Sequence, residues 1–177
     1  MIASVNALGT HGLACKRSAG RHPRHSELND TIWRALQRAQ IPSTKEPTGL
    51  SRSEHKRPDG VTMIPWAQGR CLTWDVTSPD TLVASHLAES AVRAGSAKKM
   101  AKYAQIAITH AFVPLAFESL GAWGVQCQQF VSELGRRITT ATDDARETSY
   151  LRQRLSIAVQ RGNAIACRGT MSHESDD

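Results

Sequence analysis

Apolar and polar side chains that alternate with a period of two are the pattern of a β-strand with one buried face. The pattern is clearest between residues 70 and 77, where the apolar positions are Leu72, Trp74 and Val76. A second apolar run lies at residues 61–66, and Gln68-Gly69 between the two runs is typical of a turn. The stretch therefore predicts a β-hairpin whose first strand is bulged or edge-like at Pro65, because proline has no N–H to donate.

Apolar residues at helical spacing predict helices on both sides of this hairpin. They lie at residues 26–40, 80–107, 127–138 and 151–159. Residues 41–50 form either a short strand ending near Glu46 or a surface loop, and residues 112–118 have the apolar content of a buried strand. This order predicts an α/β fold with a small mixed sheet flanked by helices, and with extra helices at the C-terminal end.

Composition divides the chain into three parts. Residues 1–24 lack apolar periodicity and are predicted to be a basic irregular arm, whereas residues 164–177 are polar and acidic and are predicted to be a disordered tail. Residues 25–163 are expected to form one domain with its own core. No apolar run approaches the roughly 20 residues that cross a bilayer, so we expect an intracellular protein without a membrane partner.

Positive charge is concentrated in the N-terminal third of the chain. The net charge is +6, and residues 16–57 contain ten basic residues against four acidic ones. A basic surface attracts a phosphate backbone through counterion release, although a solvated surface that aids solubility would have the same composition. The chain has no Walker A loop, GxSxG or HExxH motif, which argues against nucleotide hydrolysis and against serine or zinc proteolysis.

Two aspartates frame the predicted hairpin. If the turn centres on Gln68, Val61 faces Asp75 and Asp59 faces Thr77, so that Asp59 and Asp75 lie diagonally on one face, about 7 to 8 Å apart at Cα. Carboxylates that close can share a divalent metal ion. The alternative is an ordinary amphipathic hairpin with two solvent-exposed aspartates.

The segment KRPDG at residues 56–60, the segment LTWDVT at residues 72–77, and Lys99 with Lys102-Tyr103 carry a resemblance to a known family. The chain resembles the PD-(D/E)xK nucleases, and in particular the restriction-like endonuclease region that follows the reverse transcriptase in certain non-LTR retrotransposons. The resemblance implies a restriction-endonuclease-like sheet in which Asp59 and Asp75 bind Mg²⁺ or Mn²⁺.

Thr77 stands where the family pattern has a lysine. The resemblance implies that the lysine comes instead from the following helix, so Lys102 is the expected catalytic cation, with Lys99 on the neighbouring face. Glu46 is a candidate third metal ligand, and Glu27 or Asp30 could lend an acid from the first helix. The residues expected to contact nucleic acid are Arg21, Arg24, Lys56, Arg57, Lys99 and Tyr103. His25 is interpreted either as a phosphate contact or as an ordinary surface histidine.

The function implied by the resemblance is that of a retroelement endonuclease domain, which nicks target DNA so that the exposed 3′ end primes reverse transcription. Its partners would be DNA and the RNA of the parent element, and its location nuclear if it acts on DNA. His11 and Cys15 resemble half of a zinc knuckle, but two ligands do not close a tetrahedral site, so no zinc is expected. The alternatives are a catalytically decayed remnant that still binds nucleic acid, and a metal-free interaction module.

Overall fold

The predicted hairpin forms the centre of a four-stranded sheet in a computed structural model of the chain, which describes residues 21–50, 57–79 and 88–171. The strands follow the order β1-β2-β3-β4 and are β1 (Ser43–Lys45), β2 (Gly60–Ala67), β3 (Arg70–Thr77) and β4 (Ala111–Ala116). The first three strands pair antiparallel, whereas β4 runs parallel to β3. The sheet is therefore mixed, as the sequence predicted.

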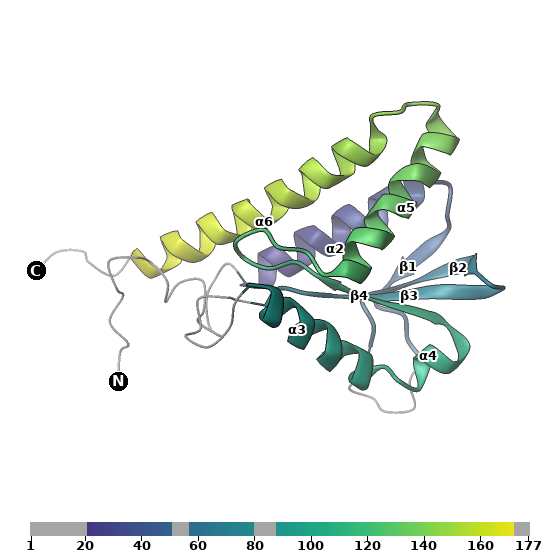
Figure 1. Ribbon diagram of the computed structural model, residues 1–177, viewed down its shortest axis with the longest axis horizontal. Coiled ribbons are helices and arrows are strands. Elements are labelled where there is room, and N and C mark those ends of the chain that lie inside the picture. The colour runs from purple at the N-terminus through teal and green to yellow at the C-terminus, as the bar shows by residue number, and fades with distance from the viewer. Residues whose placement is uncertain (1–20, 51–56, 80–87, 172–177) are drawn as a thin grey trace, which may run out of the picture.

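Helices cover both faces of the sheet (Figure 1). One face is covered by α2 (Arg21–Arg38) and α5 (Val125–Thr142), on which α6 (Glu147–Met171) packs. The other face is covered by α3 (Ala88–Lys102) and α4 (Ile106–Thr109). This arrangement confirms the predicted α/β class, including the additional C-terminal helices. Within the described ranges, no helix combines the length and the apolar character that a membrane span requires.

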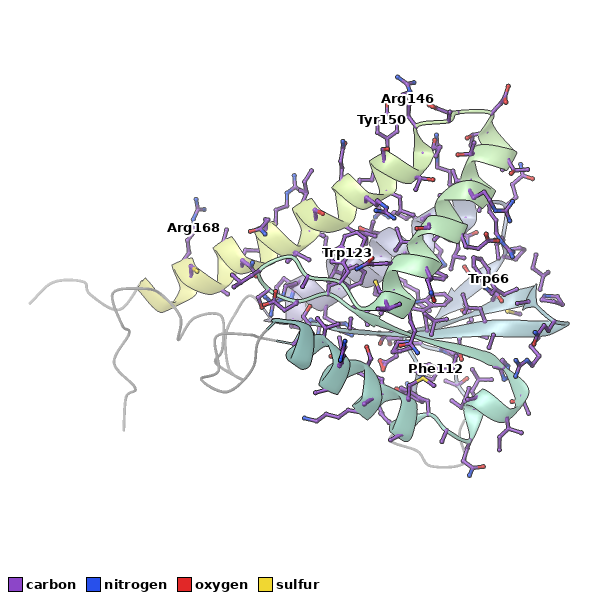
Figure 2. All side chains as sticks on the ribbon, viewed as in Figure 1. Trp66, Phe112, Trp123, Arg146, Tyr150 and Arg168 are labelled. Carbon is purple, nitrogen blue, oxygen red and sulfur yellow. The ribbon has the colours of Figure 1, made fainter. Side chains whose placement is uncertain are left out.

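The alternation along β3 separates the core from the polar face. Leu72, Trp74 and Val76 are fully buried and belong to the main hydrophobic cluster, together with residues of α2, α5 and α6. The intervening residues, among them Asp75, point to the opposite face, which α3 covers. Figure 2 shows Trp66 on the side of α5 and Phe112 on the side of α3, where it packs against Tyr103.

The two strand prolines lie where the missing N–H is tolerated. Pro114 belongs to β4, the edge strand of the sheet. Pro65 lies in an interior strand, but the pairing of β2 with β3 is irregular on both sides of it, and β1 pairs only with residues 60–62. Both positions agree with the prediction of an edge or a bulge.

The predicted pairing of the hairpin is wrong near its open end. Val61 pairs with Thr73 rather than with Asp75, because the irregularities around Pro65 shift β2 relative to β3. The Asp59 N–H donates to the carbonyl of Trp74 over 2.9 Å. Asp59 therefore lies beside Asp75 and not opposite Thr77, so the two acids are closer than the diagonal arrangement implied.

The predicted domain boundaries also differ from the observed helices. α2 begins at Arg21, inside the predicted arm, and α6 continues to Met171, beyond the predicted limit at residue 163. The first turn of α2 packs on α6, where a Cβ on Gly162 would lie 2.4 Å from the Cβ of Arg24. This contact holds α6 against α2 at Gly162, and the helix continues from there to Met171.

Gly60 accommodates the largest side chain of the core. A Cβ at this position would lie 2.0 Å from Cζ2 of Trp74, so the indole ring can lie against the strand only when residue 60 has no side chain. The ring nitrogen of Trp74 donates to the amide oxygen of Asn29 on α2 over 2.8 Å. The ring therefore cannot move aside without losing a buried hydrogen bond.

Gly60→Ala is expected to lower the free energy of unfolding by about 3 kcal/mol, at the upper end of overpacking effects. Gly69→Ala is the matched control, because a Cβ there meets nothing within 4 Å and only the φ of +69° causes strain. The control should cost about 1 kcal/mol. Urea denaturation followed by tryptophan fluorescence measures both, and equal losses would contradict the packing argument.

Candidate metal centre

Three side chains from three separate segments converge at the open end of the hairpin. His25 comes from α2, Asp59 immediately precedes β2, and Asp75 lies in β3. Each offers one ligand atom, and these atoms all lie within 4.8 Å of one another. Within the described residues, no other group of three or more histidines, cysteines and acids lies close enough together to hold a metal ion.

Backbone hydrogen bonds fix the position of Asp59. Its carbonyl accepts from the N–H of Glu46 over 3.0 Å and from the side-chain amide of Asn29 over 3.3 Å. Its carboxylate accepts from the N–H of Val76 over 2.6 Å. Asp59 is thus held by β1, α2 and β3 together, although it lies outside the regular part of β2.

The position of His25 follows from α2. His25 and Asn29 are four residues apart and therefore lie on the same face of the helix. Because Asn29 bonds both to Trp74 and to the carbonyl of Asp59, it holds this face against the sheet. Nε2 of His25 lies 3.0 Å from Oδ2 of Asp59.

The amine nearest the two acids comes from α3. Nζ of Lys99 lies 2.9 Å from Oδ1 and 2.7 Å from Oδ2 of Asp75. Lys102, the lysine predicted for this role, instead places its Nζ 4.6 Å from the ring centroid of Tyr103. Tyr103 is buried and donates its hydroxyl proton to the carbonyl of Arg57. A lysine from the helix thus contacts the second acid, but it is Lys99.

The environment moves the pKa values of the two carboxyls in opposite directions. Burial and the neighbouring charge of Asp59 raise the pKa of Asp75, and Lys99 and Lys102 offset only part of this effect. Burial also acts to raise the pKa of Asp59, but the hydrogen bond and charge of His25, the Val76 N–H and Lys99 together place that pKa below its usual value. Opposite shifts are expected of two carboxyls that share one site, because the charge of one disfavours ionisation of the other.

The same pair acts on the neighbouring side chains. The hydrogen bond from Asp59 raises the pKa of His25 against the effect of burial, and the charges of both aspartates add to this increase. Burial and the charge of Asp75 raise the pKa of Tyr103, so Tyr103 stays a neutral hydroxyl. The negative charges of the two aspartates therefore contribute to both shifts.

The remaining predicted acids lie outside the cluster. Glu46 is exposed, and it approaches Asp59 through its backbone N–H and not through its carboxylate. On α2, Asp30 pairs with Lys45 and Glu27 with Arg161. The first helix does contribute a third side chain to the site, but this side chain is a histidine.

The residues predicted to contact nucleic acid differ in how far they are exposed to solvent. Arg57 is exposed next to Asp59, whereas Arg24 is buried and donates to Oδ1 of Asn163 over 2.6 Å and to the hydroxyl of Ser119 over 3.3 Å. Arg24 therefore stabilises the contact of α2 with α6 and does not face solvent. The side chain of Arg21, and all of Lys56, His11 and Cys15, lie outside the described part of the structure.

The donor set fits a divalent cation. Two ligand atoms at about 2.1 Å from an octahedral ion, in neighbouring positions, are about 3.0 Å apart. Nε2 of His25 and Oδ2 of Asp59 have this separation, which is also that of a hydrogen bond. The three ligand atoms, which lie within 4.8 Å of one another, would close around an ion by a small movement of the side chains. Asp75 can release one oxygen to an ion and keep the other on Lys99, since Nζ contacts both.

Comparisons with known proteins add no further information about this site. The chain matches no protein-family model, and no curated protein is significantly similar to it.

Mn²⁺ or Mg²⁺ is expected to raise the melting temperature of the protein, because an ion bound only by the folded state stabilises it by about 2.7 kcal/mol at a hundredfold excess over Kd. Asp59→Asn and Asp75→Asn should each abolish this increase, since each removes one of the two anionic ligands. Differential scanning fluorimetry against metal concentration measures the effect.

Asp30→Asn is the control for this experiment, because Asp30 lies on α2 but pairs with Lys45 outside the cluster. It should keep the full metal-induced increase. A shift that survives in Asp59→Asn and Asp75→Asn would mean that the ion binds elsewhere.

Arg24→Met is expected to lower the free energy of unfolding by about 1 to 3 kcal/mol, because it leaves the buried oxygen of Asn163 without its charged donor. Arg34→Met, an exposed position on the same helix, should change the free energy by less than about 0.5 kcal/mol. Urea denaturation of both variants checks this structural role. Equal stability of the two variants would contradict this structural role.

Proposed function

We propose that this domain is a metal-dependent DNA endonuclease. The observation that carries the proposal is the convergence of Asp59, Asp75 and His25, with the amine of Lys99 in contact with Asp75. Two acids with a lysine beside them are suited to hydrolysis of a phosphodiester, because they can hold a cation and place a positive donor where negative charge develops.

A bound Mg²⁺ or Mn²⁺ would supply a Lewis acid that lowers the pKa of a coordinated water. Asp59 and Asp75 would provide the anionic ligands. Asp75 lies in β3, and Asp59, just before β2, is held by hydrogen bonds with Glu46, Trp74 and Val76. Lys99 lies close enough to Asp75 to donate to a phosphate oxygen bound beside it. Tyr103 remains protonated and, through its bond to the Arg57 carbonyl, fixes the segment that leads into Asp59.

The charges of the site also match this substrate. Asp59 and Asp75 together carry two negative charges, which a divalent cation neutralises. Lys99 then adds one positive charge, and a single phosphodiester group contributes one negative charge. These four contributions add up to zero when the substrate phosphate is bound. His25 adds no charge, because a histidine that binds a metal ion is neutral. With the ion bound and before the phosphate binds, the site would carry one net positive charge, which favours an anionic substrate.

Positive residues near the site and along the chain favour DNA as the partner. Arg57 is exposed two residues before Asp59, and Lys102 lies on the helix that carries Lys99. The net charge of +6 adds a long-range attraction for phosphate that weakens as salt increases.

The retroelement origin is supported by the sequence alone. KRPDG and LTWDVT carry the resemblance to the endonuclease region of non-LTR retrotransposons. In that setting the enzyme would nick target DNA in the nucleus, and the exposed 3′ end would prime reverse transcription of the element's RNA. Lys99 on α3 would act in place of the lysine that the family pattern has at the position of Thr77.

A nucleic-acid-binding remnant without catalysis is the second candidate. It is favoured by one observation: protein groups already occupy the acids. Lys99 contacts both oxygens of Asp75, and Asp59 accepts from Val76 and lies within hydrogen-bond distance of His25. A site that has lost its metal could persist as such an internal ion network.

Lys99→Met is expected to reduce nicking of supercoiled plasmid in Mn²⁺ or Mg²⁺ by about 10²- to 10³-fold, the usual cost of removing one donor to a developing charge. Lys98→Met should retain nicking close to the wild-type rate, because Lys98 is exposed on the same helix and contacts neither acid. Agarose gel electrophoresis of time courses gives the rates.

Asp59→Ala and Asp75→Ala complete the experiment and should show no nicking above the metal-free background. If wild type and both variants are equally inactive while salt-sensitive DNA binding persists, the remnant is the correct description.

A further inference from the structure

We propose that His25 is the third protein ligand of the metal centre, and that its nitrogen makes the centre favour Mn²⁺ and similar transition-metal ions over Mg²⁺. The inference concerns the site of the proposed function and specifies its cofactor. It predicts ion binding by the protein alone, so it can be tested without DNA.

The position of His25 is that of a ligand. Nε2 lies 3.0 Å from Oδ2 of Asp59, and the ligand atoms of His25, Asp59 and Asp75 share a region 4.8 Å across. The helix that carries His25 cannot withdraw, because Asn29, one turn further along, is bonded to Trp74 and to the carbonyl of Asp59. The imidazole is therefore presented to the two carboxylates by a rigid element.

The Asp59 oxygen that faces His25 has another hydrogen-bond partner as well. Oδ2 of Asp59 already accepts the N–H of Val76 over 2.6 Å. Lys99 supplies the positive charge next to Asp75. The imidazole is thus a second partner of the same oxygen, and in the proposed centre its nitrogen would bind the ion instead.

Ligand chemistry determines which ion such a site selects. Mg²⁺ binds oxygen ligands, keeps several waters and gains little from a nitrogen. Imidazole suits transition metals, and affinity for mixed nitrogen and oxygen sites rises from Mn²⁺ along the first row. Replacing the third oxygen of an acidic site by Nε2 of His25 therefore shifts its preference away from Mg²⁺.

The ratio of Mn²⁺ to Mg²⁺ affinity is the quantity to measure. Isothermal titration of the full chain with each ion gives the two dissociation constants for wild type, His25→Asp and His22→Asp. His25→Asp restores an all-oxygen site, so the ratio should fall at least about tenfold while Mg²⁺ still binds. His22→Asp is matched in chemistry and lies on the same helix, but His22 is exposed, and its ratio should stay within about twofold of wild type.

His25→Gln protects the test against misfolding of His25→Asp, because it keeps a neutral side chain of similar length. If circular dichroism shows that His25→Asp is unfolded, a tenfold loss of Mn²⁺ affinity in folded His25→Gln supports the proposal, and an unchanged affinity overturns it. An unchanged ratio in folded His25→Asp, or the absence of Mn²⁺ binding by wild type, also overturns it.

Plasmid nicking by the same samples separates this proposal from the proposed function. If the ratio of Mn²⁺ to Mg²⁺ affinity falls in His25→Asp but the wild type does not nick DNA, the ligand assignment is supported and the endonuclease is rejected. If nicking requires Asp59 and Asp75 but the ratio of Mn²⁺ to Mg²⁺ affinity does not depend on His25, the endonuclease is supported and the ligand assignment is rejected.

Discussion

The contact of the Trp74 ring with the backbone of Gly60 is the constraint on which the site depends. The ring fills the space that a side chain at residue 60 would occupy, and its N–H reaches Asn29 on α2. Asn29 in turn bonds the carbonyl of Asp59. One buried aromatic side chain thereby fixes the distance between α2, β2 and β3, and the three proposed ligands are carried by these elements or lie directly beside them.

This arrangement places the chemistry on the polar face of a strand whose other face is the core. Trp74 and Val76 point to α2 and α5, so Asp75 between them must point to α3. Burying Asp75 beside Asp59 is unfavourable in the absence of a cation, and Lys99 and His25 reduce this cost only in part. The two acids are thus paired within the protein by His25 and Lys99, and the proposed ion would take over part of this pairing.

The sequence predicted the hairpin and the common face of the two acids, because alternation in residues 70–77 and the turn at Gln68-Gly69 are local signals. It also predicted a bulge or an edge at Pro65, but not the resulting change of register, so it placed Asp59 opposite Thr77 instead of beside Asp75. The same limit explains His25: its role depends on α2 beginning at Arg21 and on the bond between Asn29 and Trp74, and no spacing in the chain shows that bond. Lys99 and Lys102 could not be separated either, because both lie within one turn of α3 and only its packing angle decides which one reaches Asp75.

The most direct test of the account is the position of the ion itself. Crystals grown with Mn²⁺ and measured at the manganese absorption edge should give one strong anomalous peak about 2 Å from Nε2 of His25 and from one oxygen each of Asp59 and Asp75. The account would be contradicted if no peak appears there and if His25 still contacts Asp59, and Lys99 still contacts Asp75, as they do without the ion.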